Sequence, residues 1–340
     1  MPVLPGHDLG GEFEGRAGEP LLPRPSPQEK FKMITIGQRR ISTLVLSTAL
    51  GPDGQGIFPY TLWPSYRRLL RTVKETATTV FTKSATRFPR RGNFVTANPL
   101  TWKYIRRLPN LGMLNAYGLT NEGVDKVAPQ IGAACREGFQ VIPNYWPEFG
   151  KGSEIAVQET LEAVALYRQH MGEAFWALEL NFSCPNVPED IACNVTDGLA
   201  SVRALKSAHP DLFIIAKLSV VHPYEFAQEL ERVGVGALHA VNTIPYDLAF
   251  PPDRFPPSPL AHVGGGGVSG GPAFPQAYEY NKGLRSLVRL PIIMGCGVTS
   301  QDDVQRYLDL GADAVSICTL ALRKQNVVEN IIKTFQSHLK

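Results

Sequence analysis

The chain has 340 residues, of which 44% are hydrophobic and 9% aromatic. These values are typical of a globular protein with a sizeable core, and the length fits one large barrel, which takes about 250 residues plus insertions. A net charge of +3 is too small to indicate nucleic-acid binding. The densest basic group has helical spacing and is interpreted as a solvated helix face; it comprises Arg67, Arg68, Arg71 and Lys74.

The sequence shows neither a membrane span nor a secretory signal, and its cysteines show no paired spacing. Together these features predict a cytoplasmic protein. No apolar run approaches the roughly 18 residues that a bilayer span requires. The N-terminus lacks the basic start and apolar stretch of a secretory signal. The five cysteines, at 135, 184, 193, 296 and 318, are odd in number and have no paired metal-ligand spacing. We therefore expect reduced thiols, no metal site and a cytoplasmic location.

The first 30 residues differ in composition from the rest of the chain. Residues 1–30 are rich in Pro, Gly and Glu and have no apolar period. We expect a flexible arm, with docking onto a neighbouring subunit as the alternative. Six prolines between positions 2 and 27 argue against a helix lying on a membrane. Residues 31–340 are expected to form one domain.

Beyond the arm, short apolar runs alternate with helical periods. The eight runs are 44–47, 79–82, 139–142, 176–182, 213–218, 237–241, 291–294 and 314–317. Most are continuous rather than alternating, which indicates strands buried on both faces of a parallel sheet. Eight β→α alternations favour an α/β fold of the (β/α)8 TIM barrel type. An open doubly wound sheet is the alternative that the pattern alone leaves open.

Helix ends and insertions complete the predicted layout. Ser153 is expected to cap one helix, Pro223 to open another, and Ser300 to cap a third that ends at Gly311. Two stretches, 84–121 and 243–275, do not fit the repeat and are expected to be excursions over the C-terminal face of the barrel. Such insertions tend to be lids or binding loops, with disordered surface loops as the alternative.

Polar residues follow the predicted strands at the end where barrels place their catalytic groups. Lys217 lies inside the apolar run 213–218, where a buried ammonium is costly unless an anion or acceptor compensates it. One explanation is a structural salt bridge to a core carboxylate. The other is a phosphate-bearing cofactor, because Gly297 and Thr319 end the last two strands, where N–H groups bind phosphate. FMN fits, since a Lys can stabilise the negative charge of the reduced ring.

Cys184 follows the fourth strand in the segment 181–186, Asn-Phe-Ser-Cys-Pro-Asn. A free cysteine is commonly a small core hydrophobe. Here, however, Pro185 ends the strand and the neighbours are asparagines. A thiol with a pKa moved toward neutrality can act as a proton-abstracting base. Four asparagines at strand ends or adjoining loops together suit an imide or carboxylate-bearing ring; they are Asn115, Asn181, Asn186 and Asn242.

Taken in order, these motifs resemble the dihydroorotate dehydrogenase family from about residue 40 to the C-terminus. The matching segments are Thr82-Lys83-Ser84, 89–93 (PRRGN), 115–119 (NAYGL), 181–186 (NFSCPN), Lys217, 241–243 (VNT), 267–270 (GVSG) and Cys318-Thr319. As a set they are highly specific. A Cys rather than a Ser at the base position is similar to the soluble branch of the family.

The resemblance implies FMN-dependent oxidation of dihydroorotate to orotate in pyrimidine biosynthesis. Cys184 would remove the C5 proton while hydride passes from C6 to flavin N5, with Ser183 and Lys217 in the same catalytic group. The implied substrate residues are Lys83, Asn115, Gly118, Leu119, Asn181, Asn186, Asn242 and Thr243. The implied flavin residues are Ala49, Lys83, Asn115, Asn181, Lys217, Val241, Gly270, Cys296, Gly297, Cys318 and Thr319.

Several positions depart from the family pattern. The chain has Leu50 where the family usually has Ser, and Cys296 and Cys318 stand in motifs that are usually richer in glycine. Tyr117 replaces a residue that is commonly Met. These departures leave open a relative that acts on another cyclic pyrimidine or enone-like ring, and a non-catalytic flavin-binding barrel. A homodimer or an electron-transfer partner subunit is expected, and fumarate, NAD through a partner and quinone remain alternative acceptors.

Overall fold

The computed structural model describes residues 34–37, 39–182 and 191–337. The predicted arm, 1–30, lies outside these residues, so its flexibility stays a prediction. The described chain begins with an antiparallel hairpin of β1 (Ile34–Ile36) and β2 (Arg39–Ile41). This hairpin directly precedes the first barrel strand, and it brings Ile36 and Ile41 into the apolar interior.

Eight parallel strand positions close into a barrel. The order is β3 (Leu44–Ser47), β4 (Thr79–Phe81), β7 (Gln140–Ile142) with β8 (Asn144–Tyr145), β9 (Ala177–Asn181), β10 (Phe213–Leu218), β11 (Ala237–Ala240), β14 (Ile292–Gly295) and β15 (Ala314–Ile317). Pro143 separates β7, which pairs with β4, from β8, which pairs with β9. Because residues 140–145 thus join both edges of the sheet, the TIM barrel is confirmed and the open sheet is not.

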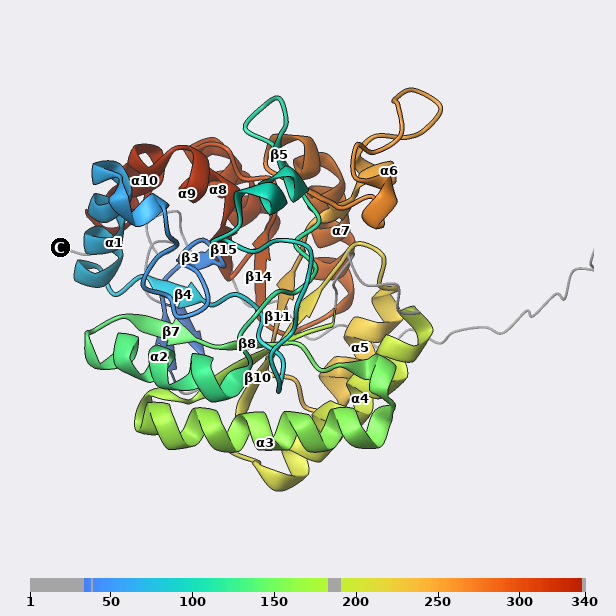
Figure 1. Ribbon diagram of the computed structural model, residues 1–340. Helices are drawn as coiled ribbons and strands as arrows, with labels where there is room; N and C mark the ends of the chain where they lie inside the picture. The colour runs from blue at the N-terminus through green and yellow to red at the C-terminus, as the bar shows by residue number, and fades with distance from the viewer. Residues whose placement is uncertain (1–33, 38, 183–190, 338–340) are drawn as a thin grey trace, which may run out of the picture.

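Helices surround these strands, as Figure 1 shows. They are α1 (Pro64–Glu75), α2 (Val124–Arg136), α3 (Ser153–Met171), α4 (Ile191–Ala208), α5 (Tyr224–Arg232), α7 (Phe274–Leu287), α8 (Gln301–Leu310), α9 (Thr319–Arg323) and α10 (Gln325–Ser337). Short 3-10 helices are Tyr60–Leu62, Pro99–Tyr104, Phe149–Lys151, Gly172–Ala174, Ala261–Val263 and Gly271–Ala273.

The predicted ends of α8 and the predicted start of α5 are confirmed, whereas the predicted cap of α3 by Ser153 is wrong. Ser300 caps α8 by accepting from the Asp303 N–H, and Gly311 ends that helix in a left-handed conformation. Pro223 immediately precedes α5. Ser153, in contrast, is the first residue of α3, and its hydroxyl donates to the carboxylate of Asp197.

The N-terminal end of the barrel lumen is apolar. Side chains from several strands and from the β1–β2 hairpin meet there and are almost fully buried; they include Ile36, Ile41, Val45, Phe81, Ile142, Ile215 and Ile293. Burying each such side chain contributes about 1.5–3 kcal/mol relative to exposing it. This half of the lumen is a packed plug that supports whatever lies above it.

The two predicted excursions form one antiparallel sheet. Its strands are β5 (Ile105–Arg107), β6 (Met113–Asn115), β12 (Ile244–Pro245) and β13 (Gly267–Ser269), in the order β12-β13-β6-β5; the short helix α6 (Tyr246–Ala249) follows β12. A hydrogen bond of 2.8 Å between the hydroxyls of Thr319 and Ser269 ties this sheet to the carboxyl end of β15. The excursions are therefore ordered structure rather than disordered loops.

Candidate active site

A buried charged cluster lies inside the barrel, above the apolar plug. Neighbouring strands β9, β10 and β11 contribute Glu179, Lys217 and His239, and Lys217 pairs in register with His239. The Lys217 Nζ donates to the Ser47 hydroxyl at 3.0 Å and lies 3.7 Å from the Glu179 Oε2. The Glu179 side chain is fully buried. The core carboxylate of the salt-bridge alternative is thus present beside Lys217.

Two further side chains form hydrogen bonds with the Glu179 carboxylate. One of its oxygens is hydrogen-bonded to the His239 Nδ1, and the other accepts from the Asn144 amide. Burial alone would raise the pKa of Glu179, but Lys217, His239 and Asn144 together hold it below its ordinary value. Burial lowers the pKa of His239 against the opposing effect of Glu179. The cluster therefore joins a lysine, a carboxylate and a histidine side by side in the buried lumen.

Ser219 and His222 follow the end of β10. Ser219 lies two residues past Lys217, directly after the end of β10. Its buried hydroxyl has no hydrogen-bond partner within the described part of the chain. The His222 Nδ1 accepts from the Ser219 N–H at 3.0 Å. Burial lowers the pKa of His222 to about 4, although backbone hydrogen bonds with Ser219 and Phe182 oppose the shift. His222 thus links the carboxyl ends of β9 and β10.

Lys83 and Ser84 follow β4 at the mouth of the barrel. The backbone N–H of Lys83 donates to the Gly51 carbonyl at 2.9 Å. Its Nζ lies 3.2 Å from the centroid of the Tyr117 ring. The Asn181 amide at the end of β9 donates to the Ser84 hydroxyl at 3.0 Å. The structure therefore brings Lys83, Asn181 and Tyr117 to the same end of the barrel.

The other described substrate candidates lie on strand ends and on the loop after β6. The Asn115 amide donates to the Gly267 carbonyl at 3.3 Å, joining both excursions. Asn242 follows β11, and its Oδ1 accepts from the Thr243 N–H at 2.9 Å. Gly118 and Leu119 both have positive φ, at 75° and 59°. Gly118 must lack a side chain, because a Cβ there would lie 2.8 Å from the Asn93 backbone nitrogen.

The predicted flavin positions gather at the ends of β3, β13, β14 and β15. A 3.1 Å contact joins the Thr48 hydroxyl to the Cys318 sulfur, and the Ala49 carbonyl accepts from the Tyr66 hydroxyl at 2.7 Å. Gly270 and Gly297 both have positive φ, and a Cβ on Gly297 would lie 2.4 Å from the Phe274 Cα. Val241, next to the end of β11, is almost fully buried.

The two cysteines among these positions are protonated thiols. Burial, with a smaller contribution from Cys318, raises the pKa of Cys296 to about 12 in spite of Lys217. Burial also raises the pKa of Cys318, against the Thr48 hydrogen bond and the charges of Lys217 and Lys83. In both thiols the charge of Lys217 opposes the effect of burial on the pKa. Leu50, which the resemblance also implies to be a departure from the family pattern, is a fully buried member of the core.

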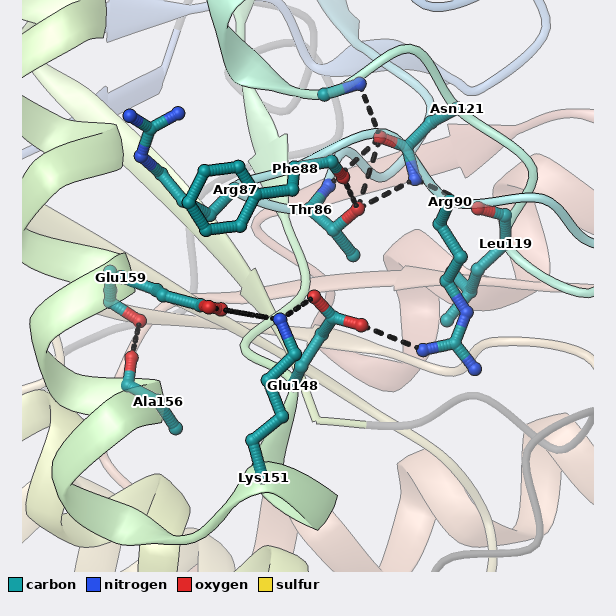
Figure 2. Close-up of polar contacts among 12 residues, drawn as sticks. Thr86, Arg87, Phe88, Arg90, Leu119, Asn121, Glu148, Lys151, Ala156 and Glu159 are labelled. Carbon is teal, nitrogen blue, oxygen red and sulfur yellow. Dashed lines mark hydrogen bonds and ion pairs between the residues drawn. The ribbon is translucent and has the colours of Figure 1, made fainter.

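A polar network anchors the loop that precedes the substrate candidates. The Arg90 guanidinium contacts Glu148 at 2.9 Å, and Glu148 also pairs with Lys151 at 2.7 Å. Lys151 in turn contacts Glu159 of α3 at 2.9 Å. Figure 2 shows the Lys151 amine between the two carboxylates, with Arg90 on the far side of Glu148. Backbone hydrogen bonds in both directions then join Arg90 to Asn121.

Three predicted site residues are not placed by the structure. Ser183, Cys184 and Asn186 lie outside the described residues. Within the described ranges, no group of His, Cys, Asp or Glu side chains is arranged to hold a metal ion. No helix among those residues is long and apolar enough to cross a membrane.

Sequence reasoning missed Glu179, His239, His222 and the Arg90–Glu148 network. Glu179 and His239 could have been found by the rule that singled out Lys217, because each is an ionisable residue inside a continuous apolar run. His222 carried a weaker signal, as the residue before the proline that opens α5. No sequence signal could have paired Arg90 with Glu148, because Glu148 lies 58 residues further along the chain.

Comparison with known proteins gives a consistent picture. A family model described as dihydroorotate dehydrogenase matches residues 67–339. The catalytic subunit of dihydroorotate dehydrogenase B (NAD(+)) from Oceanobacillus iheyensis is 31% identical over 258 residues, covering 74% of this chain and 78% of that protein. The same subunit from Anoxybacillus flavithermus is 34% identical over 227 residues, covering 65% and 69%. Dihydroorotate dehydrogenase A (fumarate) from Lactobacillus helveticus is 27% identical over 237 residues, covering 67% and 73%.

Proposed function

This chain belongs to the dihydroorotate dehydrogenase family, oxidoreductases that act on CH–CH groups, and we propose that it oxidises dihydroorotate to orotate with bound FMN. The observation that carries this proposal is the gathering of two lysines and three asparagine amides at one end of the barrel. These residues are Lys83, Lys217, Asn115, Asn181 and Asn242.

The chemistry of this set matches a carboxylate-bearing cyclic imide. Each asparagine offers a donor and an acceptor, as the ring carbonyls and N–H groups of dihydroorotate require. Lys83 supplies a cation for the carboxylate, which a neutral ring such as dihydrouracil would not need. Gly118, Leu119 and Thr243, together with Asn186 outside the described residues, complete the proposed substrate set.

The residues around Lys217 fit a flavin. The buried Ser219 hydroxyl, two residues past Lys217 and directly after β10, has no partner among the described residues. A ligand in the barrel mouth would satisfy it. Lys217 would hold the pyrimidine part of the ring, and the backbone at Gly270, Gly297 and Thr319 would hold the phosphate. When bound, FMN supplies the two-electron acceptor for the oxidation.

Cys184 is the proposed base, with Ser183 beside it. The thiolate would take the proton from the substrate C5 as the C6 hydride leaves. Cys184→Ser should slow anaerobic flavin reduction by dihydroorotate and move its optimum to higher pH, because a hydroxyl is a far weaker acid than a thiol. An unchanged reduction rate in Cys184→Ala would exclude Cys184 as the base.

The decisive experiment is anaerobic addition of dihydroorotate to the purified yellow protein. Bleaching of the flavin absorbance supports the proposal, whereas flavin that stays oxidised rejects dihydroorotate as substrate. Dihydrouracil serves as the parallel probe, since a reduction by it alone would indicate another cyclic pyrimidine. Protein that carries no flavin after gentle purification would point to a barrel without this activity.

The electron acceptor is a separate part of the proposal. Two of the relatives above are named as NAD(+)-type catalytic subunits and one as a fumarate type. We propose that electrons leave either to fumarate or, through an electron-transfer partner subunit, to NAD. Reoxidation of the reduced protein by fumarate alone would identify the first route. Dependence on a co-purified subunit would identify the second.

A further inference from the structure

Tyr117 is held rigidly beside the mouth of the barrel. Its carbonyl accepts from the backbone N–H groups of Asn93 and Phe94 at 3.1 and 3.2 Å. Its ring packs against the Phe94 ring at a centroid distance of 4.9 Å. Its hydroxyl is hydrogen-bonded to the Thr96 side chain, and burial raises the pKa of that hydroxyl in spite of this bond. The ring is therefore a fixed, uncharged surface.

Lys83 places its ammonium on this surface. The nitrogen lies 3.2 Å from the ring centroid, well inside the roughly 6 Å range of a cation–π contact. The neighbouring residue Ser84 is tied to Asn181 at the end of β9. The charge of Lys83 also acts on the thiol of Cys318 at the end of β15. The contact between Lys83 and Tyr117 therefore lies at the end of the barrel where β4 and β9 end.

The two lysines at this end of the barrel are held by different chemistry. Glu179 lies beside Lys217 and offsets its positive charge. An aromatic ring, in contrast, fixes an ammonium through its negative face without cancelling the charge. A side chain fixed before the ligand arrives also loses less rotamer freedom on binding. Tyr117 therefore fixes the position of the Lys83 ammonium at the barrel mouth before a ligand binds.

We propose that Tyr117 is a specificity-determining residue, which holds the Lys83 ammonium in place so that the site prefers a carboxylate-bearing ring over the same ring without its carboxylate. This inference rests on the proposed function, because it assigns Lys83 to the substrate carboxylate. It goes beyond that function by giving a selective role to the position where this chain departs from its family.

The first test measures the ring contact without any ligand. Reductive methylation with 13C-formaldehyde labels lysines and keeps their charge, and Lys83→Arg identifies the Lys83 signal. Ring current from Tyr117 should shift this signal upfield in the wild type and in Tyr117→Phe. The shift should disappear in Tyr117→Leu. A Lys83 signal at the ordinary position in the wild type would overturn the proposal.

The second test measures equilibrium binding of orotate and uracil to the holoenzyme by titration of the flavin absorbance. Wild type and Tyr117→Phe should prefer orotate by the same factor, because both keep the ring. Tyr117→Leu should reduce this preference about three- to tenfold, a size in keeping with one cation–π contact. An unchanged preference in Tyr117→Leu would overturn the proposal, as would a wild type that does not prefer orotate.

A double-mutant cycle separates this role from general damage to the loop. Lys83→Met should remove most of the orotate preference, and Tyr117→Leu in that background should then have no further effect. A further loss in the double variant would contradict the assignment. Failure of dihydroorotate to reduce the wild-type flavin rejects the proposed function instead, because the methylation and binding experiments require no turnover.

Discussion

The two ends of the barrel lumen are lined by the same strands but differ in chemistry. Toward the N-terminal end, Ile215 and Ile293 pack with the β1–β2 hairpin into an apolar plug. Toward the other end, Lys217 on the same strand as Ile215 joins Glu179 and His239 in a charged cluster. Two residues apart on β10, Ile215 therefore packs in the apolar plug and Lys217 belongs to the charged cluster. In barrels the first end stabilises the fold and the second performs chemistry.

The largest expected effect comes from breaking the charged cluster. Glu179→Gln should lower the free energy of unfolding by about 3–5 kcal/mol, because it leaves the buried Lys217 ammonium without its counter-charge. Chemical denaturation at neutral pH measures the loss. Lys217→Met added to Glu179→Gln should recover part of it. A single variant as stable as the wild type would mean that the pair does not stabilise the barrel.

A cavity in the apolar plug should lower the stability of the protein without changing flavin binding. Ile293→Ala is expected to lower the free energy of unfolding by about 2–5 kcal/mol through lost burial and a residual cavity. The flavin dissociation constant, measured by fluorescence titration, should stay at the wild-type value. Lys217→Ala is the matched variant at the other end, and it should weaken flavin binding and slow its reduction. If Ile293→Ala weakened flavin binding as much as Lys217→Ala, the two ends of the barrel lumen would not differ in function as described.

His222, which follows the end of β10, should make stability depend on pH. Burial lowers the pKa of His222 to about 4, whereas the unfolded chain titrates near 6.5. Between these values the unfolded state binds more protons, so stability is complete above pH 6.5 and falls as the pH drops toward 4. The total loss is roughly 3 kcal/mol.

His222→Asn tests this pH dependence. Asparagine keeps an acceptor for the Ser219 N–H but does not titrate in this range. Urea midpoints between pH 4.5 and 6.5 should therefore vary less in the variant than in the wild type. Burial also lowers the pKa of His239, which acts in the same direction and should leave a residual slope. Identical slopes in both proteins would contradict the assignment to His222.

The smallest expected effect concerns the network that anchors the loop outside the barrel. Glu148→Gln removes the charge that Arg90 and Lys151 share and should lower the free energy of unfolding by about 1–2 kcal/mol. The Michaelis constant for dihydroorotate should rise more than kcat falls, because this loop is bonded to the segment that carries Gly118 and Leu119 of the proposed substrate set. Glu154→Gln, on the exposed face of α3, is the control and should stay within about 0.5 kcal/mol of the wild type.

The barrel could be predicted from sequence because its signals are local. All eight predicted strands are present, since continuous apolar runs such as 213–218 report burial on both faces. Ser300 and Gly311 ended α8 as expected, because both act on the residues beside them. Ser153 did not cap α3, because Gly152 with φ of 95° takes that position and Asp197, from a distant segment, accepts the hydroxyl.

The parts of the site that sequence did not predict depend on distant partners. Lys217 could be flagged as a costly buried charge, but its compensation by Glu179 required the register of β9 against β10. The strands β6 and β13 are three residues each, too short to have a readable period. The placement of Lys83 on the ring of Tyr117 joins two loops whose conformations no local rule specifies.

The sheet built from the two excursions also bears on the order in which the molecule assembles. β13 lies between β6 and β12, and the bond from Asn115 to Gly267 joins residues 152 positions apart. Contacts of such long sequence separation form late, because chain entropy must be lost before they contribute. We expect refolding chains to gain hydrogen-exchange protection in the barrel helices first and at residues 113–115 and 267–269 last. The sheet that covers the barrel mouth, next to Tyr117, would then be the final part of the protein to acquire its shape.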